Sequence, residues 1–360
     1  MTHFPSQRKR WLFVAMAAAM AVLIMCVALL GIDIYLHSRF QKSAGVNIWG
    51  YRGPVVARKQ PGELRVAFLG GSTAFGYGVS WGEAIPAQLE KGLNAQRAQG
   101  APRATVLNLA YNNEGAYSFR FTLEDYQYLK YDIACLYEGY NDMMGDSDNP
   151  NTSVFRRDSP VFKLTGYLPI FPVIFREKAA SLLYGGDLNS YYRQLLGETN
   201  KTVFHPGLAN RTAAGALNAT AAIEQSLEHQ MAKAMGEKRR VIIGGDRSGC
   251  PYPWGQYCLS MFAAVDYALK NGARVLVVGQ PHLEGQTLRE RHNEQQATLV
   301  KGLATRYPGN PRVQYVSVGD TVDISNPLMG YDHMHLTAPA SAIVAAALVK
   351  PVVALAQVKP

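Results

Sequence analysis

Two motifs at opposite ends of this 360-residue chain carry side chains suited to nucleophilic chemistry. In LGGS (residues 69–72) a serine follows two glycines at the end of an apolar run, and YDHMH (residues 331–335) supplies a carboxylate and an imidazole three residues apart. A serine hydroxyl is a weak nucleophile that an adjacent imidazole activates, while a carboxylate orients the imidazole. We therefore expect Ser72 to act as nucleophile, His335 as base and Asp332 as its partner, with a turn or half-turn of helix bringing the last two to one side.

Two further motifs supply candidate hydrogen-bond donors for an oxyanion. NNEGAY (residues 112–117) and EGYND (residues 138–142) follow the next two apolar runs. Preorganised N–H groups stabilise the charge that develops during acyl transfer. The predicted donors are the backbone N–H groups of Ser72 and Gly115 and the side-chain amide of Asn141. Each motif alone is compatible with an ordinary turn, but all four occur in order at the ends of predicted elements, which favours a single site.

Several neighbouring residues have simpler interpretations. We expect Asp142 to order its loop and Glu138 to be unnecessary for the chemistry. His282 could line the substrate pocket, but we expect it to be an ordinary loop histidine. The segment GGSTAFGYG (residues 70–78) could cradle a phosphate, but it contains neither G-x-x-x-x-G-K-S/T nor G-x-G-x-x-G. Those patterns are typical of nucleotide-binding loops, so nucleotide binding is a remote alternative.

Together the four motifs resemble the sequence blocks of SGNH hydrolases, the GDSL-like lipase and esterase superfamily. FLGGSTAFG (residues 68–76) resembles the first block, with GGST in place of GDSL. Gly115 resembles the second-block glycine, GYND (residues 139–142) the third block and DHMH (residues 332–335) the last. NIWGYRG (residues 47–53) resembles a lead-in found in membrane-anchored members.

This resemblance spans residues 47 to about 345 and is weakest over residues 145–270. Its D-x-x-H spacing selects His335 rather than His333 as the base. It implies an α/β/α sandwich and an ester hydrolase that works through an acyl-Ser72 intermediate. The resemblance calls for no metal ion and no organic cofactor.

Short apolar runs alternate with helical patterns along much of the chain. Such alternation predicts a parallel sheet covered on both faces, with its sites at the carboxyl ends of the strands. The predicted fold class is α/β: a three-layer α/β/α sandwich with a five-stranded, mostly parallel, flavodoxin-like sheet, within residues 63–360. We expect strands at 64–69, 106–110, 133–137, 274–279 and 313–318, and helices at 82–97, 212–235, 256–270, 286–305 and 338–349.

The segment at about 145–210 interrupts this alternation. It is rich in aromatic residues and prolines, as in GYLPIFPVIF (residues 166–175). We interpret it as an insertion after the third strand. Its role stays open between a lid, a glycan-binding rim, a surface resting on a membrane and a purely structural excursion.

The N-terminal region predicts a membrane anchor. Residues 11–32 contain no charged side chain, and a helix needs about 20 apolar residues to cross a bilayer. No small-x-small cleavage site follows, so an uncleaved anchor over residues 11–36 is favoured over a signal peptide. A cytoplasmic tail (residues 1–10) would precede it and a connector (residues 37–62) would follow.

The orientation of this anchor follows from its flanking charges. Arg8, Lys9 and Arg10 favour a cytoplasmic N-terminus, although Arg39 and Arg52 on the other flank weaken that inference. The large domain would then lie outside the cytoplasm, in the periplasm of a Gram-negative cell.

Composition excludes some classes of protein. The chain is 48% hydrophobic and 18% charged, which is typical of a globular rather than a disordered protein. Of its formal net charge of +9, residues 1–42 hold +4, from five basic residues against Asp33, which leaves +5 for the remainder. That charge is too dilute for a nucleic-acid-binding surface.

The four cysteines give no metal site at the sequence level, because no Cys/His cluster has the spacing of zinc ligands. Cys26 falls in the predicted anchor and Cys135 in a predicted strand. Cys250 and Cys258 flank a turn-rich loop and could form a disulfide in an oxidising compartment, a question that spacing alone leaves open.

These observations predict a membrane-anchored, extracytoplasmic serine esterase acting on carboxylic esters, such as acetylated carbohydrates of the envelope, lipids or small esters. One alternative is an O-acyltransferase that uses the same residues to acylate sugar hydroxyls. Another is a non-catalytic glycan-binding or scaffold protein that retains the fold. The natural ester, the oligomeric state and any protein partners stay open.

Overall fold

The computed structural model describes residues 7–41, 45–97, 100–143, 159–187, 191, 204–236, 245, 249–332 and 334–359. The chain divides into two compact units. The anchor unit comprises Met1–Arg39 and Ser159–Glu237, and the sheet unit comprises Phe40–Asp158 and Lys238–Pro360.

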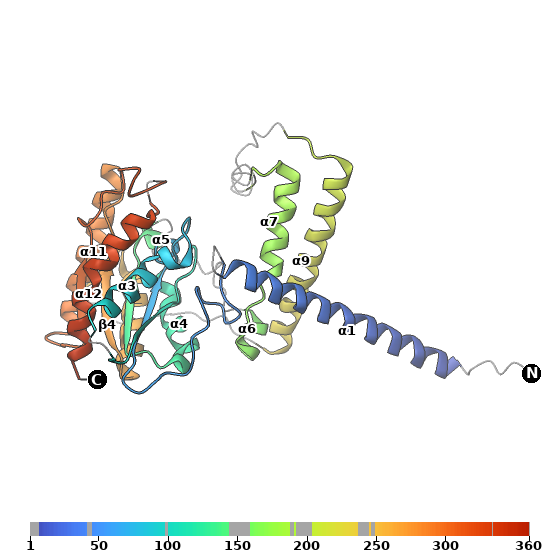
Figure 1. Cartoon of the computed structure of the whole chain (residues 1–360), viewed down its shortest axis with the longest axis horizontal. Coiled ribbons are helices and arrows are strands. Elements are labelled where there is room, and N and C mark those ends of the chain that lie inside the picture. The colour runs from blue at the N-terminus through green and yellow to red at the C-terminus, as the bar shows by residue number, and fades with distance from the viewer. Residues whose placement is uncertain are drawn as a thin grey trace, which may run out of the picture. The chain divides into compact units, whose positions relative to one another are not determined.

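Five parallel strands form the centre of the sheet unit (Figure 1). Their order is β2-β1-β3-β4-β5, and every neighbouring pair is parallel. This is the flavodoxin-like order, in which ligands bind where the strand order reverses, beside β1 and β3. The predicted α/β fold with a five-stranded sheet is therefore confirmed. The strands are β1 (Leu64–Gly70), β2 (Ala104–Asn108), β3 (Ile133–Tyr137), β4 (Arg274–Gly279) and β5 (Val313–Ser317).

Helices cover both faces of this sheet. On one face α3 (Ile85–Ala95) and α12 (Ala338–Gln357) pack together, and α12 also contacts β3, β4 and β5. On the other face α10 (Gly255–Lys270) packs against α4 (Phe119–Asp125), α11 (Gln286–Arg306), β3 and β4. α12 is long and apolar enough to cross a membrane, but it packs on the sheet and 44% of its most apolar window is buried, so it is a core helix.

Short helices follow the first three strands and begin the loops at the carboxyl edge of the sheet. They are α2 (Ser72–Phe75) after β1, the 3-10 helix η2 (Ala116–Ser118) after β2 and α5 (Tyr140–Met143) after β3. Two further 3-10 turns, η1 (Trp81–Glu83) and η3 (Gln127–Leu129), precede α3 and β3.

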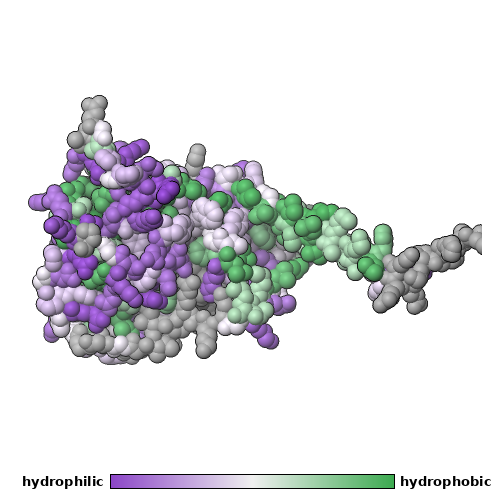
Figure 2. Space-filling view, turned by 90° about the horizontal axis from the view of Figure 1, so that it is seen from below, coloured by the Kyte–Doolittle hydropathy of each residue, from purple (hydrophilic) through white to green (hydrophobic). Residues whose placement is uncertain are grey.

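The anchor unit contains a long apolar helix and a helical hairpin. α1 (Gln7–Phe40) continues past the predicted end of the anchor at residue 36. Within Arg10–Phe40 the most apolar window of 18 residues has a mean hydropathy of 2.8, and none of that window is buried. The exposed surface of α1 is accordingly hydrophobic (Figure 2). By length and composition α1 could cross a membrane or act as a signal sequence.

The remaining helices of the anchor unit are α6 (Pro160–Thr165), α7 (Phe171–Tyr184) and α9 (Leu208–Ala234). α7 and α9 pack side by side, and α6 contacts α9 (Figure 1). The helix expected over residues 212–235 is therefore present as part of α9, which belongs to the anchor unit and not to the sheet unit. Because α9 pairs with α7, the inserted part of this unit runs from Ser159 to Glu237, which differs from the expected insertion over 145–210.

Hydrogen bonds join α1 to the start of α7 within the anchor unit. Asp33 Oδ1 accepts the backbone N–H groups of Ile170 (2.8 Å) and Phe171 (2.6 Å), and Tyr167 donates its hydroxyl to Asp33 Oδ2. The first N–H groups of a helix have no partner in the helix itself. The one acidic side chain of α1 therefore caps the N-terminus of α7.

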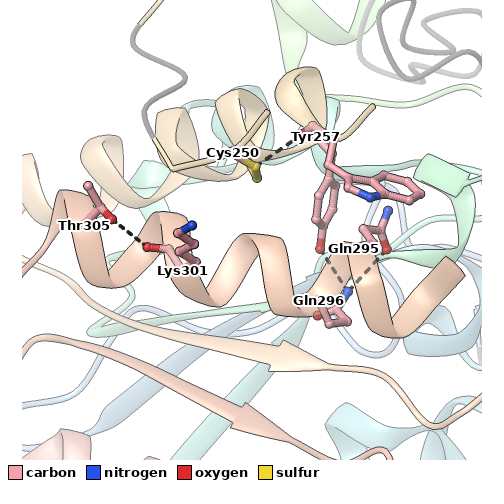
Figure 3. Close-up of a disulfide and its surroundings, with 8 residues drawn as sticks. Cys250, Tyr257, Gln295, Gln296, Lys301 and Thr305 are labelled. Carbon is pink, nitrogen blue, oxygen red and sulfur yellow. Dashed lines mark hydrogen bonds between the residues drawn. A yellow bond between two sulfur atoms is a disulfide. The ribbon is translucent and has the colours of Figure 1, made fainter. Parts of the chain in front are cut away.

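A disulfide joins Cys250 and Cys258 at the start of α10, with Cα atoms 6.1 Å apart. Figure 3 shows its surroundings, where α10 lies over α11. The pairing that spacing left open is thus present in the structure. Cys26 is an exposed free cysteine on α1, and Cys135 is a buried free cysteine in β3.

Candidate active site

Ser72 lies at the carboxyl end of β1, as the first residue of α2. The two residues before Ser72 must be glycines, because neighbouring atoms leave no room for a side chain at either position. A Cβ added at Gly70 would lie 2.4 Å from the carbonyl oxygen of Tyr137, and one added at Gly71 would lie 2.2 Å from Nδ2 of Asn141. The GGS sequence thus lets the turn pass directly against the loop after β3, and Ser72 is left 8% exposed.

A continuous chain of hydrogen bonds links Ser72 to Asp332. Oγ of Ser72 lies 2.7 Å from Nε2 of His335, and Nδ1 of His335 lies 2.6 Å from Oδ2 of Asp332. A carboxylate only accepts hydrogen bonds, so Nδ1 carries the proton and Nε2 accepts from the serine hydroxyl. This tautomer is the one in which the imidazole can take up the serine proton.

The loop around Asp332 shows how a carboxylate three residues before His335 can contact the imidazole. Oδ1 of Asp332 accepts the backbone N–H groups of Met334 (3.3 Å) and His335 (2.7 Å), and these hydrogen bonds bring Asp332 and His335 to one side. Partial burial pushes the pKa of Asp332 upward, but the hydrogen bonds from the backbone and ring of His335 outweigh burial and hold that pKa below its usual value. Asp332 therefore stays ionised beside the imidazole at neutral pH.

Three loops meet at the position predicted for the oxyanion donors. Nδ2 of Asn141 donates one N–H to the carbonyl oxygen of Glu114 (2.9 Å), and Asp142 Oδ2 accepts the N–H of Ala116 (3.0 Å). A Cβ added at Gly115 would lie 2.9 Å from Oδ1 of Asp142, so a glycine is needed where these loops touch. Asp142 orders the loop, as expected. The loop that carries Ser72 contacts the other two loops through Gly71, which lies against the side chain of Asn141.

The buried carboxyl of Glu138 lies close enough to Asp142 for the two to interact electrostatically. Oε1 of Glu138 accepts the backbone N–H groups of Gly139 (3.0 Å) and Asn141 (3.1 Å). Burial, reinforced by the neighbouring Asp142, raises the pKa of Glu138, and burial also raises the pKa of Asp142. Sequence reasoning left Glu138 without a role, although its place directly after β3 is a signal that could have marked it.

A buried glutamine connects the serine loop to the loop after β3. Gln280 is 2% exposed, and its Nε2 donates to Oγ1 of Thr73 (3.0 Å) while its Oε1 accepts the N–H of Tyr140 (3.0 Å). On α11, Gln295 donates to the carbonyl oxygen of Gly139 (3.1 Å), and Gln296 donates to the hydroxyl of Tyr257, as Figure 3 shows. Sequence reasoning missed Gln280, which directly follows β4.

Two tyrosines flank the imidazole of His335. The ring of Tyr331 stacks on it at 5.8 Å between centroids and 18° between planes, and the ring of Tyr77 lies 4.9 Å away. The hydroxyl of Tyr331 donates to the carbonyl oxygen of Tyr77 (2.8 Å). Gly78 has a φ of +85°, and a Cβ there would lie 2.3 Å from that hydroxyl. Tyr331 thus links the loop of the imidazole to the loop of the serine.

Arg52 holds the other end of α2. It is 3% exposed, and its guanidinium donates to the carbonyl oxygens of Phe75, Gly76 (2.6 Å) and Val79 (2.5 Å). It also lies over the ring of Phe75, 4.3 Å from the centroid. Burial lowers its pKa to about 10, so it stays charged at neutral pH. This arginine belongs to the NIWGYRG segment, which had no structural role at the sequence level.

The sequence also places histidines at 282 and 333 near these motifs. His282 pairs through Nε2 with Asp320 (3.2 Å), as an ordinary loop histidine would. His333, the neighbour of the proposed base, lies outside the described residues. Within the described part of the chain, no group of three or more His, Cys, Asp or Glu side chains could hold a metal ion.

Comparison with protein-family models gives no match for this sequence, and comparison with curated proteins gives none either. Solved structures do show similarity. An α/β hydrolase enzyme, LAE5, from the metagenome of Lake Arreo is 12% identical, with 81% of this chain and 96% of that chain covered and a TM-score of 0.43. A protein assigned to the lipolytic G-D-S-L family of Desulfitobacterium hafniense is 10% identical, with coverages of 80% and 98% and a TM-score of 0.37.

The acetylxylan esterase Axe2 of Geobacillus stearothermophilus is also similar, at 10% identity, with 80% of this chain and 94% of that chain covered and a TM-score of 0.40. These neighbours are hydrolases and esterases, and one belongs to the G-D-S-L group that the four motifs resemble. The likeness is distant, so we base the functional proposal on this chain's own residues.

Proposed function

We propose that this protein is a serine esterase of the SGNH type that hydrolyses carboxylic esters through an acyl-Ser72 intermediate. One observation carries the proposal: the unbroken hydrogen-bonded series from Asp332 through His335 to Oγ of Ser72. Few structural roles require a serine, an imidazole and a carboxylate in this order and tautomer, whereas nucleophilic catalysis does.

In the first step, Oγ of Ser72 attacks the ester carbonyl while Nε2 of His335 takes the hydroxyl proton. The carbonyl becomes a tetrahedral oxyanion, for which the N–H groups of Ser72 and Gly115 and the second amide N–H of Asn141 are the proposed donors. One such donor contributes about 3–4 kcal/mol to lowering the barrier. The C–O bond to the alcohol then breaks, and the alcohol leaves with the proton from His335.

In the second step, His335 takes a proton from water, and the resulting hydroxide attacks the acyl group on Ser72. The second tetrahedral intermediate collapses, the bond to Oγ breaks, and Oγ regains the proton from His335. Asp332 keeps Nδ1 protonated throughout and favours the imidazolium that forms twice in each cycle. If a sugar hydroxyl replaces water here, the same residues carry out O-acyl transfer.

We further propose that α1 anchors the enzyme in a membrane with the sheet unit outside the cytoplasm. The apolar, exposed surface of α1 supports the anchor, and the disulfide between Cys250 and Cys258 supports an oxidising compartment. An anchored enzyme in that compartment meets acylated glycans of the envelope, which makes O-acetyl groups our proposed substrate class.

The test uses the full-length chain in detergent micelles. Wild-type protein should react with a fluorophosphonate probe and hydrolyse p-nitrophenyl acetate, and Ser72→Ala should abolish both while keeping the wild-type melting temperature. An equal rate in wild type and Ser72→Ala would rule out Ser72 as the nucleophile.

The two adjacent histidines provide a matched control. His335→Ala should reduce kcat by at least about a thousandfold, as loss of a catalytic base typically does, while His333→Ala should leave it within about threefold. The reverse result would move the base to His333. Adding sugar acceptors to the same assay then separates hydrolysis from transfer, because transfer yields an acylated sugar in place of free acid.

A further inference from the structure

The C-terminal half of α9 carries a row of large, exposed apolar side chains. Ile223, Leu227 and Met231 follow one another at four-residue spacing and are 56%, 54% and 37% exposed. Side chains four residues apart lie on one face of a helix, so these three form a continuous surface, here called the α9 apolar face. An exposed apolar surface of this kind indicates contact with another protein or with a membrane.

The charged residues of this part of α9 point away from the α9 apolar face. Glu224 and Glu228 each stand one position after a residue of the face, which turns them about 100° from it, and both are half-buried. Ser159 donates its hydroxyl to Glu228. His229 stands two positions after the middle residue of the face, and residues two apart do not face each other on a helix. The face itself is therefore uncharged.

The α9 apolar face belongs to the end of the α7–α9 hairpin that contacts α1. The two helices run antiparallel, because Gly185 at the end of α7 lies against the ring of Phe204, shortly before the start of α9. The C-terminal half of α9 therefore packs beside the start of α7. Glu224 is accordingly close enough to Arg176 of α7 and Asp33 of α1 to interact with both electrostatically.

Asp33 marks the point where the proposed anchor leaves the membrane. It directly follows residues 11–32, which contain no charged side chain. With a rise of 1.5 Å per residue, this run spans about 33 Å, close to the thickness of the hydrocarbon core of a bilayer. Because Asp33 accepts the N–H groups of Ile170 and Phe171, the start of α7 is held at the level of the lipid headgroups.

The hairpin crosses α1 rather than continuing its direction (Figure 1). In a membrane that α1 spans, α7 and α9 would therefore run along the membrane surface. Helices in that position bury an apolar face about 5–10 Å into the boundary between headgroups and acyl chains. The half of α9 that is held beside Asp33 is the half that carries such a face.

We propose that the α9 apolar face rests in the bilayer that α1 spans, with Ile223, Leu227 and Met231 reaching past the headgroups to the acyl chains. The insertion is then a second membrane contact of this protein, and it prevents the anchor unit from rotating freely about the axis of α1. This inference rests on the proposed anchoring role of α1 and is independent of the esterase chemistry.

The experiment uses the full-length chain in phosphatidylcholine nanodiscs, with an NBD fluorophore attached to one exposed cysteine. Wild type offers Cys26 on α1, because Cys135 is buried and the other two cysteines form the disulfide. Nitroxide-labelled lipid quenches a fluorophore among the acyl chains, and iodide quenches one in water. At Cys26 the nitroxide lipid should remove most of the fluorescence and iodide little, which tests the anchor itself.

Leu227→Cys in a Cys26→Ser background then tests the α9 apolar face. Its label should lose most of its fluorescence to nitroxide lipid, as at position 26, and be shielded from iodide. Gln225→Cys in the same background is the matched control, since Gln225 is exposed on the same turn but points to the other side of α9. Its label should be quenched by iodide and only weakly by nitroxide lipid.

The outcomes separate this inference from the anchor. If iodide quenches the label at position 227 as strongly as at 225 while Cys26 is quenched by lipid, the face lies in water, and the inference is overturned while the anchor stands. Shielding of position 227 from both quenchers also overturns it, because a second copy or the sheet unit would then cover the face. If nitroxide lipid does not quench the label at Cys26, the anchor and this inference fall together.

Discussion

At the scale of single residues, the site depends on side chains that hold the reacting groups as much as on the reacting groups themselves. His335 is kept in one tautomer by Asp332, and the rings of Tyr77 and Tyr331 lie against its imidazole. Its imidazole must lie within hydrogen-bond reach of Ser72 in a stable geometry to act as a base. Tyr331 is suited to maintain that geometry because it contacts both loops.

We predict that Tyr331→Phe lowers kcat with little effect on KM. The substitution keeps the ring on His335 but removes the hydroxyl that donates to the carbonyl oxygen of Tyr77. Loss of one hydrogen bond of this kind corresponds to about a two- to tenfold decrease in rate. Steady-state kinetics with p-nitrophenyl acetate check it, and Tyr252→Phe, at a 76% exposed tyrosine, is the control. Wild-type kcat in Tyr331→Phe would show that ring stacking alone positions His335.

At the scale of elements, the proposed nucleophile Ser72 lies on a helix too short to be stable alone. α2 has four residues, and isolated helices shorter than about 12–15 residues are marginal in water. Its position is fixed from outside, by the glycine turn at its start, Gln280 at Thr73, and Arg52 at its end. Asn108 adds to this support, because its Nδ2 donates to the carbonyl oxygen of Phe75 (3.2 Å).

We predict that Arg52→Met destabilises the protein and slows labelling of Ser72. The substitution leaves the carbonyl oxygens of Phe75, Gly76 and Val79 without their charged donor. Such losses typically cost about 2–4 kcal/mol of unfolding free energy. Chemical denaturation and the fluorophosphonate rate measure the two effects. The exposed Arg58→Met is the control, and wild-type values in Arg52→Met would contradict the role of this arginine.

At the scale of the whole molecule, the chain forms two units that fold around different centres. The sheet unit carries Ser72 and His335, although 263 residues separate them. The anchor unit joins α1 to the hairpin of α7 and α9 through Asp33. The insertion thus belongs with the helix that precedes the sheet, and the two units can be perturbed separately.

We predict that Asp33→Ala loosens the hairpin and leaves the chemistry intact. The first N–H groups of α7 lose their acceptor, which typically costs about 0.5–2 kcal/mol of helix stability. Hydrogen exchange in micelles should show faster exchange at Ile170 and Phe171, with an unchanged labelling rate at Ser72. Asp33→Asn, which can still accept an N–H, should resemble wild type. Slower labelling of Ser72 in Asp33→Ala would mean that the two units are coupled.

The sequence by itself determined the strands, the fold class and the identity of the polar groups at the carboxyl edge of the sheet. Apolar runs such as LRVAFL specify buried strands because both faces of a parallel sheet are covered. The glycines before Ser72 and the D-x-x-H spacing are local patterns, readable without a partner. The local pattern also predicted the helix over residues 212–235, but it did not predict that this helix packs against α7.

Only the tertiary structure decided which distant side chains support the site. Gln280, Tyr331 and Arg52 each act through a partner remote in sequence, and burial, which raises the pKa of Glu138, has no local signature. The disulfide between Cys250 and Cys258 and the pairing of α9 with α7 are of the same kind, since both depend on which surfaces meet when the chain folds. The spacing of apolar residues in the sequence shows which face of a helix or strand is apolar. Which element covers that face is decided only when the chain packs into its tertiary structure.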